Sequence, residues 1–377
     1  MLSLDDLLAP ITPDQFRADY EGRKPLHIPA PEGAARRALL TWEGFNTLLS
    51  QTVIWNSVNL KLVHNGRPIP PDDYCAEVRT QSGVEIKPSP AKVQTLMAMG
   101  ASVIAGEVQS LTPALRETAA MLGRTWAAQV GANVYCSFGG VQAFGPHFDL
   151  DDVFAVQTEG EKVWRLYANR ADSPVDYPLE GDEAVRWLAE TRGALMQEVR
   201  MRPGDVLYLP RGWYHDALTS EGASLHVTFS VTPLYGRILF RLLENAAMQD
   251  PAFRAWLPPA GRDDGRALQQ QLADLGRRLA SLTALPAFRD EVAMAQERLV
   301  PRPTGYALPD RLTLTLYRAT GLAPPQTTGP VRVAMDWALS QPQFALEDLA
   351  AQFDFVPEAP LRAAVAAAER AGALKRL

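Results

Sequence analysis

Two stretches of the chain alternate polar and apolar residues as a β-strand with one polar face does. In residues 133–138 the odd positions are Asn, Tyr and Ser, and the even positions are Val, Cys and Phe. In residues 224–231 the even positions are Ser, His, Thr and Ser, whereas the odd positions are apolar throughout. Successive strand residues point to opposite faces, so each stretch predicts one polar face. That face either meets solvent or lines a cavity inside a small barrel, and the pattern leaves both open.

Further strands are expected between turn signals in the same part of the chain. Residues 153–156 form an apolar run typical of a buried strand. Residues 206–209 form another, between Pro- and Gly-containing turns at 203–204 and 210–212. Residues 159–167 predict a tight turn followed by a strand.

Beyond residue 233 the apolar pattern changes to the helical period. Apolar residues recur at helical spacing in 238–246 and again in 268–282, and a stretch rich in Pro and Gly at 258–261 separates them. An earlier helical pattern at 182–188 lies within residues 172–202, which we interpret as an insertion between strands.

The last part of the chain predicts a small domain with three helices. A loop at 324–330 is followed by helical patterns at 331–340, 346–353 and 359–371, and Gly372 ends the last one. A chain of 377 residues is long enough for more than one domain. The predicted division is residues 1–235, 236–300 and 301–377.

Composition excludes several classes of protein. Hydrophobic residues make up 47% of the chain and charged residues 21%, which is ordinary for a globular protein. The net charge of −6 gives no general attraction to nucleic acid or to an anionic membrane. Cys75 and Cys136 are the two cysteines, too few for a disulfide framework or a zinc site. We find no signal-type N-terminus and no membrane-spanning run, so the chain is expected to be cytoplasmic and reduced.

Candidate chemistry centres on three metal-ligating side chains. His147 and Asp149 lie two residues apart, and His215 follows at a distance. If residues 147–149 are extended, His147 and Asp149 share a face and can reach one metal ion. Two imidazoles and one carboxylate form the facial triad that holds Fe(II) and leaves positions open for co-substrate and oxygen. The alternative is a polar strand end with an unrelated histidine, but only five histidines occur in the whole chain.

Lys162 is the second chemical signal. It begins the apolar strand predicted after the turn and shares a face with Trp164 and Leu166. Burial of a lysine there is costly unless the ammonium meets an anion. The far carboxylate of a dicarboxylate co-substrate would be such an anion, while its near end chelates the metal. The alternative is a solvated lysine at a turn.

The block from Gly131 to Val231 resembles the JmjC-type, cupin-fold 2-oxoglutarate oxygenases, and most of all the ribosomal oxygenases, which hydroxylate residues of ribosomal proteins. The runs HFDLDDVFAVQTEGEKVWRLY, PGDVLYLPRGWYHDALT and SLHVTFS carry the resemblance in the family's order, and ITPDQFRADYEGRKPLHI resembles the family's entry segment. The resemblance implies an α+β fold built on a double-stranded β-helix, the jelly-roll or cupin barrel.

Site roles follow from the same resemblance, position by position. It makes His147, Asp149 and His215 the catalytic iron ligands, and Lys162 the salt-bridge partner of the C5 carboxylate of 2-oxoglutarate. It makes Asn133, Tyr135 and Ser230 hydrogen-bonding neighbours of that co-substrate. The implied cofactors are Fe(II), 2-oxoglutarate and O2. The implied reaction hydroxylates a protein side chain, with arginine or histidine of a ribosomal protein as the expected target.

The resemblance also suggests roles for the C-terminal parts. It implies a helical dimerisation region at 236–300 and a winged helix within 301–377, although the helical stripes could instead pack within the chain. From Val331 to the end the chain has five basic and six acidic side chains. Because a nucleic-acid reader normally shows a basic face, we expect this domain to have a structural or protein-contacting role.

Two other interpretations stay open. The same chemistry could act on a peptide natural product, a tRNA base or a small molecule. A cupin without activity could bind ligands or proteins, although an intact triad with Lys162 argues against it.

Six further residues are noted for their position. Four flank His215 and either face the cleft mouth, where a substrate would bind, or serve packing and solvation: Tyr208, Arg211, Trp213 and Asp216. His27 and His64 lie outside the motif and are expected to be ordinary local residues.

Overall fold

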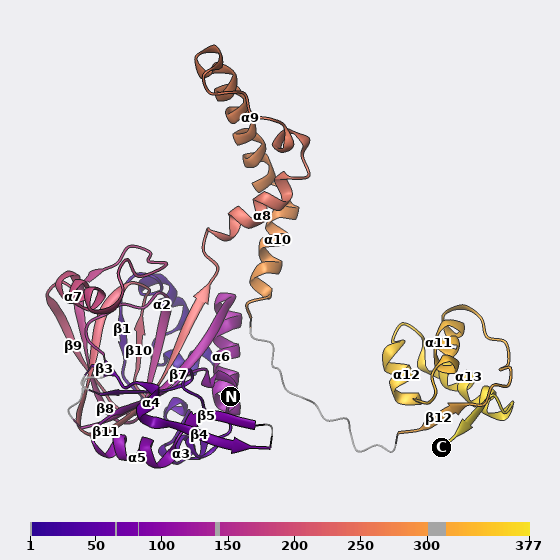
Figure 1. Ribbon diagram of the computed structural model, residues 1–377, viewed down its shortest axis with the longest axis horizontal. Coiled ribbons are helices and arrows are strands. Elements are labelled where there is room, and N and C mark those ends of the chain that lie inside the picture. The colour runs from indigo at the N-terminus through magenta and orange to yellow at the C-terminus, as the bar shows by residue number, and fades with distance from the viewer. Residues whose placement is uncertain (1, 65, 82, 140–143, 301–313) are drawn as a thin grey trace. The chain divides into compact units, whose positions relative to one another are not determined.

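Figure 1 shows the computed structural model, which describes residues 2–64, 66–81, 83–139, 144–300 and 314–377. The chain forms two compact units, residues 1–303 and residues 304–377. The predicted boundary at residue 301 lies outside the described residues.

One antiparallel sheet of nine strands is the frame of the first unit. Eight strands follow one another in the order β1 (Leu26–Ile28), β10 (Val206–Leu209), β8 (Asp152–Arg170), β11 (Trp213–Pro233), β7 (Ala128–Phe138), β6 (Ser102–Ala105), β2 (Leu60–His64) and β3 (Arg67–Pro68). The ninth, β9 (Leu195–Met201), pairs with β8. The strands predicted from the sequence are present within β7, β8, β10 and β11, whereas β1, β2, β3 and β6 lie before residue 131 and were not predicted.

The apolar faces of β7 and β11 form the core of this unit. Helix α6 (Pro113–Trp126) packs against both strands (Figure 1). Of the apolar positions predicted for residues 133–138 and 224–231, all but Phe138 are buried in one cluster, which includes Cys136, and Phe138 packs against it partly buried. The polar faces of the two strands therefore point away from this core.

Strands β8 and β11 are longer than the sequence pattern predicted. The tight turn expected at the start of 159–167 is wrong, because β8 runs without a break from Asp152 to Arg170. Gly160, with a φ of +63°, lies at an irregular register, where the four residues of β11 between Thr219 and Ser224 lie opposite the one residue of β8 between Gly160 and Lys162. A Cβ at Gly160 would lie 1.9 Å from the carbonyl oxygen of Ala223, so only glycine fits. The signal taken for a turn is a β-bulge.

The last part of the insertion predicted at 172–202 belongs to the main sheet. Its predicted helix is present as α7 (Gly181–Thr191). Its last residues form β9, which pairs with β8 and was missed. The first residues of β9, from Leu195 to Glu198, do not alternate between apolar and polar types. Leu195 and Met196 are neighbours in the chain and both are exposed, so the period of two that marks a strand was absent.

The N-terminal part of the unit is a helical lead-in with a small hairpin. Its helices are α1 (Leu4–Leu8), α2 (Pro13–Asp19), α3 (Trp42–Ser50), α4 (Pro71–Tyr74) and α5 (Pro90–Ala98), with 3-10 turns η1 (Ala35–Ala38) and η2 (Val108–Ser110). The hairpin consists of β4 (Cys75–Thr80) and β5 (Gly83–Pro88). Side chains of Ser3, Thr12, Thr41 and Thr112 cap the helices that they precede.

A buried arginine joins the lead-in to the barrel. The guanidinium of Arg36 is completely buried, and its N–H groups donate to six backbone carbonyls, those of Asp6, Leu7, Ala9, Ile28, Pro29 and Gly204. A buried charge needs this many partners, because each unpaired N–H would cost free energy.

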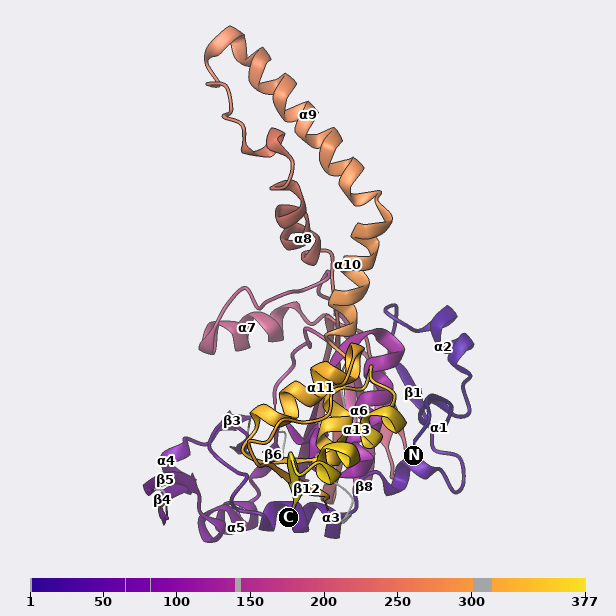
Figure 2. The ribbon, with the colours of Figure 1, turned by 90° about the vertical axis from the view of Figure 1, so that its right-hand side faces the viewer.

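Three helices follow the barrel. They are α8 (Ile238–Ala247), α9 (Arg266–Thr283) and α10 (Pro286–Glu297), with 3-10 turns η3 (Pro251–Arg254) and η4 (Arg262–Gly265) before α9. Figure 2 shows α8 alongside α9 and α10, and each of the three contacts the other two. The helices predicted at 238–246 and 268–282 are confirmed, and α10 was not predicted.

The second unit has its own sheet and core. Its elements are β12 (Leu316–Ala319), α11 (Gly329–Ser340), β13 (Phe344–Ala345), α12 (Leu346–Gln352), α13 (Glu358–Arg370) and β14 (Leu374–Arg376). The strands pair antiparallel in the order β13, β12, β14. The three predicted helices are confirmed to within two residues at each end, whereas the short strands were missed. Within the residues that the structure describes, no helix combines the length and the apolar character needed to cross a membrane.

Candidate active site

The structure brings His147, Asp149 and His215 together. One potential ligand atom of each lies within 4.8 Å of the others, and Nε2 of His215 is 3.5 Å from Oδ2 of Asp149. His147 and His215 form a single antiparallel bridge, with N···O distances of 3.0 Å and 2.8 Å in its two hydrogen bonds. Beyond this bridge, residues 144–150 form no regular strand.

Backbone carbonyls orient both imidazole rings. Nδ1 of His147 lies 2.9 Å from the carbonyl oxygen of Gly145, and Nδ1 of His215 lies 2.9 Å from that of Trp213. A carbonyl only accepts, so in each ring Nδ1 carries the proton and Nε2 keeps its lone pair for a metal. Burial, and next the nearby His147, lowers the pKa of His215 to about 4. The ring is therefore neutral at neutral pH, as a metal ligand must be.

An aromatic cluster supports the backbone between these residues. Phe148 lies between His147 and Asp149 in the chain, and its ring contacts Tyr177, Trp187 and Tyr214 at centroid distances of 4.9, 6.3 and 5.1 Å. The hydroxyl of Tyr177 donates to the carbonyl oxygen of Phe148. Tyr177 and Trp187 come from the insertion, so this segment holds the backbone that carries His147 and Asp149.

The three residues line a cavity of about 110 Å³ inside the barrel. All seven site residues predicted from the sequence line it: Asn133, Tyr135, His147, Asp149, Lys162, His215 and Ser230. The polar faces of β7 and β11 thus line a cavity, which resolves the alternative of solvent exposure.

Cross-strand pairs order the polar residues along this cavity. Successive rows pair Ser137 with Ser224, Tyr135 with His226, Asn133 with Thr228, and Gly131 with Ser230. Directly paired residues share a face, so the side chains in these rows point the same way. Neighbouring rows on one face are about 7 Å apart. We call these four rows of mostly polar side chains the polar track.

Lys162 is buried at the Ser137 end of this track. Only 2% of its surface is exposed, and its Nζ donates to Oγ of Ser137 at 3.2 Å. Burial lowers the pKa of Lys162 to about 8. Among the described residues no carboxylate comes within ion-pair distance of its ammonium. The alternative of a solvated lysine is wrong, and the buried cation fits an anionic ligand.

Six lining residues were not predicted as site residues: Phe144, Val153, Trp164, Ala217, His226 and Thr228. Three of them carry buried polar atoms without a protein partner, namely Nε1 of Trp164, Nδ1 of His226 and Oγ1 of Thr228. Buried polar atoms are normally satisfied, so these atoms indicate a polar ligand in the cavity. The alternation in 224–231 already marked His226 and Thr228, but it did not separate a ligand contact from a solvent contact.

The residues flanking His215 do not line the cavity. Tyr208 is buried and donates to Asp152 at 2.7 Å, and Asp216 is buried in an ion pair with Arg165 at 2.6 Å. The indole N–H of Trp213 donates to the carbonyl oxygen of Tyr167, and the guanidinium of Arg211 lies over the ring of Tyr235. These contacts fit the alternative that the four residues serve packing and not substrate binding.

The two outlying histidines have local surroundings. His27 lies 3.0 Å from Asp205, and His64 ends β2. Neither lines the cavity with the candidate ligands.

The antiparallel sheet thus brings two imidazoles and a carboxylate together at a site that could hold one metal ion. Residues 108–237 match the family model of the JmjC domain, which confirms the resemblance seen in the sequence. The "Bifunctional lysine-specific demethylase and histidyl-hydroxylase NO66" of Drosophila persimilis is 28% identical over 230 residues, 60% of this chain and 31% of the relative. Ribosomal oxygenase 2 of Bos taurus is 38% identical over 137 residues, 34% of this chain and 28% of the relative.

An X-ray structure of YcfD of Escherichia coli matches 97% of this chain and 98% of its own, with 16% identity and a TM-score of 0.50. This likeness concerns the fold alone. The chain spans less than a third of the length of either curated relative named above.

Proposed function

We propose that this protein is an Fe(II)- and 2-oxoglutarate-dependent oxygenase that hydroxylates a side chain of a ribosomal protein. The observation that carries the proposal is one cavity that contains both a facial set of metal-ligating side chains and a buried lysine without a carboxylate partner. A metal centre and a dicarboxylate site in one cavity are what this reaction requires.

The donor set fits ferrous iron. Nε2 of His147, Nε2 of His215 and a carboxylate oxygen of Asp149 would hold the ion and leave its other positions open. When bound, iron supplies the oxidative chemistry, in which one atom of O2 enters succinate and the other enters the hydroxyl group of the product. Carbon dioxide is the third product, and 2-oxoglutarate and the C–H bond of the substrate each supply half of the electrons that reduce O2.

The remaining cavity fits a five-carbon dicarboxylate. His215 pairs with Leu166 of β8, four residues and about 13 Å along the strand from Lys162. The flexible lysine side chain shortens this span to one that the co-substrate can bridge. Lys162 would bind the C5 carboxylate by a charge-assisted contact. Burial raises the pKa of Tyr135 to about 12, so its phenol stays protonated and can donate, beside Asn133 and Ser230.

The names of the relatives support the substrate class. The compared proteins are named ribosomal oxygenase or histidyl-hydroxylase. We therefore propose a ribosomal protein as the partner, in the cytoplasm, and arginine or histidine as the modified residue.

Intact mass spectrometry of ribosomal proteins tests this function. Proteins from wild-type cells and from cells that lack the gene are compared, and fragmentation locates the modified residue. We expect one ribosomal protein to be lighter by one oxygen atom in the mutant, and a gene copy encoding Asp149→Ala should not restore it. If every ribosomal protein keeps its mass, the ribosomal substrate is wrong.

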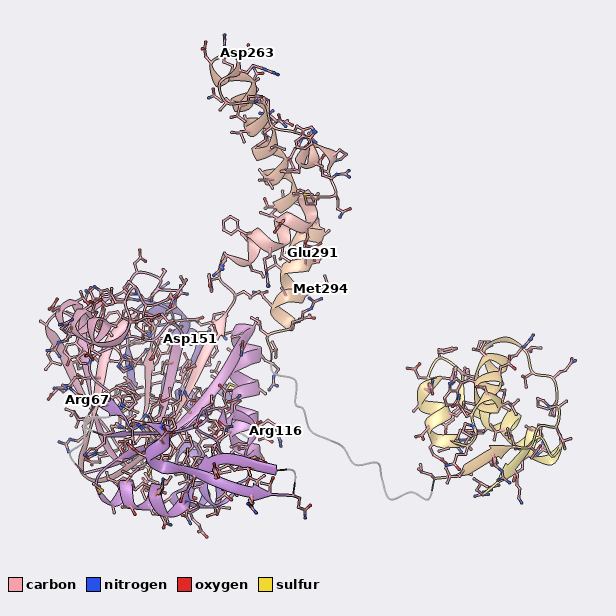
Figure 3. All side chains as sticks on the ribbon, in the orientation of Figure 1. Arg67, Arg116, Asp151, Asp263, Glu291 and Met294 are labelled. Carbon is pink, nitrogen blue, oxygen red and sulfur yellow. The ribbon has the colours of Figure 1, made fainter. Side chains whose placement is uncertain are left out.

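The helical segment supports a homodimer. Phe240 of α8 is 76% exposed and Trp256 is 97% exposed, and Leu272 and Met294 are half exposed on α9 and α10. Figure 3 shows side chains projecting from these helices, with Met294 labelled on α10. Large exposed apolar side chains on neighbouring helices favour a protein partner, and we propose that a second copy covers them.

The second unit fits the proposed winged-helix domain with a protein-contacting role. Three helices with a three-stranded antiparallel sheet are compatible with that fold. Acidic side chains outnumber basic ones from Val331 onward, which does not favour nucleic-acid binding.

A further inference from the structure

His226 is a buried histidine that the proposed metal and co-substrate assignments do not use. It lines the cavity, only 3% of its surface is exposed, and its Nδ1 has no partner. An unpaired buried nitrogen destabilises the protein unless a ligand satisfies it. His226 therefore needs an explanation beyond packing.

Its position is fixed by the pairing of β11 with β7. His226 lies opposite Tyr135, and the two rings stack in parallel at 4.8 Å between centroids. Ser137, in the next row of the same face, is 3.2 Å from Nζ of Lys162. The imidazole is thus one row from the lysine ammonium, on the wall of the same cavity.

The protonation of His226 suits contact with an anion beside a cation. Burial, and next the charge of Lys162, keeps the pKa of His226 well below its ordinary value. The ring stays neutral and does not add a second positive charge next to Lys162. A neutral imidazole still donates one hydrogen bond.

We propose that His226 binds the distal carboxylate of the co-substrate together with Lys162, and so helps the site to select a dicarboxylate. This inference rests on the proposed function. Tyr135 holds the ring by stacking, and Trp164 makes an edge contact with it at 5.5 Å between ring centroids. Both contacts fix the plane of the imidazole before the ligand binds.

A comparison of two ligands isolates this contact. Calorimetry measures binding of 2-oxoglutarate and of 2-oxopentanoate to the full chain with Mn²⁺ in place of iron. 2-Oxopentanoate keeps the metal-chelating end but has a methyl group in place of the distal carboxylate. We expect His226→Phe to weaken 2-oxoglutarate binding roughly tenfold to hundredfold, the value of a hydrogen bond to a charged group, and to leave 2-oxopentanoate unchanged.

Two further variants guard against a folding effect. His226→Asn places an amide N–H near the position of Nδ1 and should recover part of the lost 2-oxoglutarate affinity. His64→Phe is the matched control, because His64 also has a buried Nδ1 without a partner but lies outside the cavity. The control should bind both ligands as the wild type does.

The outcomes separate the inference from the function. An equal loss of both ligands in His226→Phe, or no loss of either, overturns the role of His226 while the oxygenase stands. If the wild-type protein binds Mn²⁺ but not 2-oxoglutarate, the proposed function itself fails, and the role of His226 fails with it.

Discussion

At the scale of single residues, Lys162 makes co-substrate binding depend on pH. Burial lowers the pKa of its ammonium to about 8, and a bound carboxylate would raise that pKa again. The charged form that binds the carboxylate is therefore present below pH 8 and is lost above it. We expect the dissociation constant of 2-oxoglutarate to rise about tenfold between pH 7 and pH 9. Calorimetry with Mn²⁺ across this range measures the change.

Lys162→Met supplies the control for this pH dependence. The variant keeps an unbranched apolar stem of similar length and loses the charge. Its affinity for 2-oxoglutarate should be low at pH 7 and should not fall further by pH 9. A variant that keeps the wild-type pH profile would show that another group titrates.

The same scale shows what the sequence could predict of the site. Spacing and strand patterns brought out His147, Asp149, His215 and Lys162, because metal chemistry and the burial of a charge restrict the residue types that are possible. His226 was visible as a polar position but not as a ligand contact. A period of two tells which face a residue shares and not what covers that face.

At the scale of elements, the bulge of β11 opposite β8 depends on Gly160 of β8. Its φ of +63° disfavours any side chain, and a Cβ would clash with the carbonyl oxygen of Ala223. We expect Gly160→Ala to destabilise the first unit by about 3 kcal/mol. Chemical denaturation followed by tryptophan fluorescence measures this loss.

Gly276→Ala is the matched control for the bulge. Gly276 lies within α9, where an added Cβ meets nothing within 4 Å. Because alanine favours helix over glycine, this substitution should stabilise the protein by up to about 1 kcal/mol. Similar losses in both variants would contradict a special conformation at Gly160.

The bulge also explains why a turn was predicted in the wrong place. Gly160 adopts a positive φ, which glycine supplies in hairpin turns and in bulges alike. In a hairpin turn the flanking residues pair with each other, whereas in a bulge they pair with a neighbouring strand. Here the residues on both sides of Gly160 pair with β11. Local sequence contains no information on that partner, so the pattern predicted two elements where there is one.

Tyr177 links the insertion to the candidate metal ligands. Its hydroxyl donates to the carbonyl oxygen of Phe148, the residue between His147 and Asp149. We expect Tyr177→Phe to weaken Mn²⁺ binding about tenfold, the lower end of the effect of outer-sphere partners on metal affinity. The melting temperature should change little, because the ring and its packing remain.

Tyr74→Phe is the control for that substitution. Tyr74 is a buried tyrosine whose hydroxyl, like that of Tyr177, donates to a backbone carbonyl: the oxygen of Leu60 at 3.0 Å, away from the cavity. It should lower stability slightly without any effect on Mn²⁺ affinity. Equal metal affinity in Tyr177→Phe and the wild type would show that the insertion does not position the ligands.

At the scale of the whole molecule, the sequence predicted the helices of the segment after the main sheet better than it predicted what those helices pack against. Helical periods over 238–246 and 268–282 identified α8 and α9, since a sustained apolar stripe is a local signal. Whether such a stripe packs within the chain or against a second copy depends on surfaces that local periodicity does not describe. Phe240 and Trp256 are exposed, as the second copy that we propose requires.

Replacement of Phe240 tests that association. Phe240 is exposed on α8, so a charge there should leave the fold intact and prevent an apolar interface from forming. We expect sedimentation to show a dimer for the wild type and a monomer for Phe240→Asp at the same concentration. Phe355→Asp, which alters an equally large and exposed side chain of the second unit, should remain a dimer. A wild-type monomer would leave the apolar side chains of α8 without a second copy to cover them, and the helical segment would then need another partner.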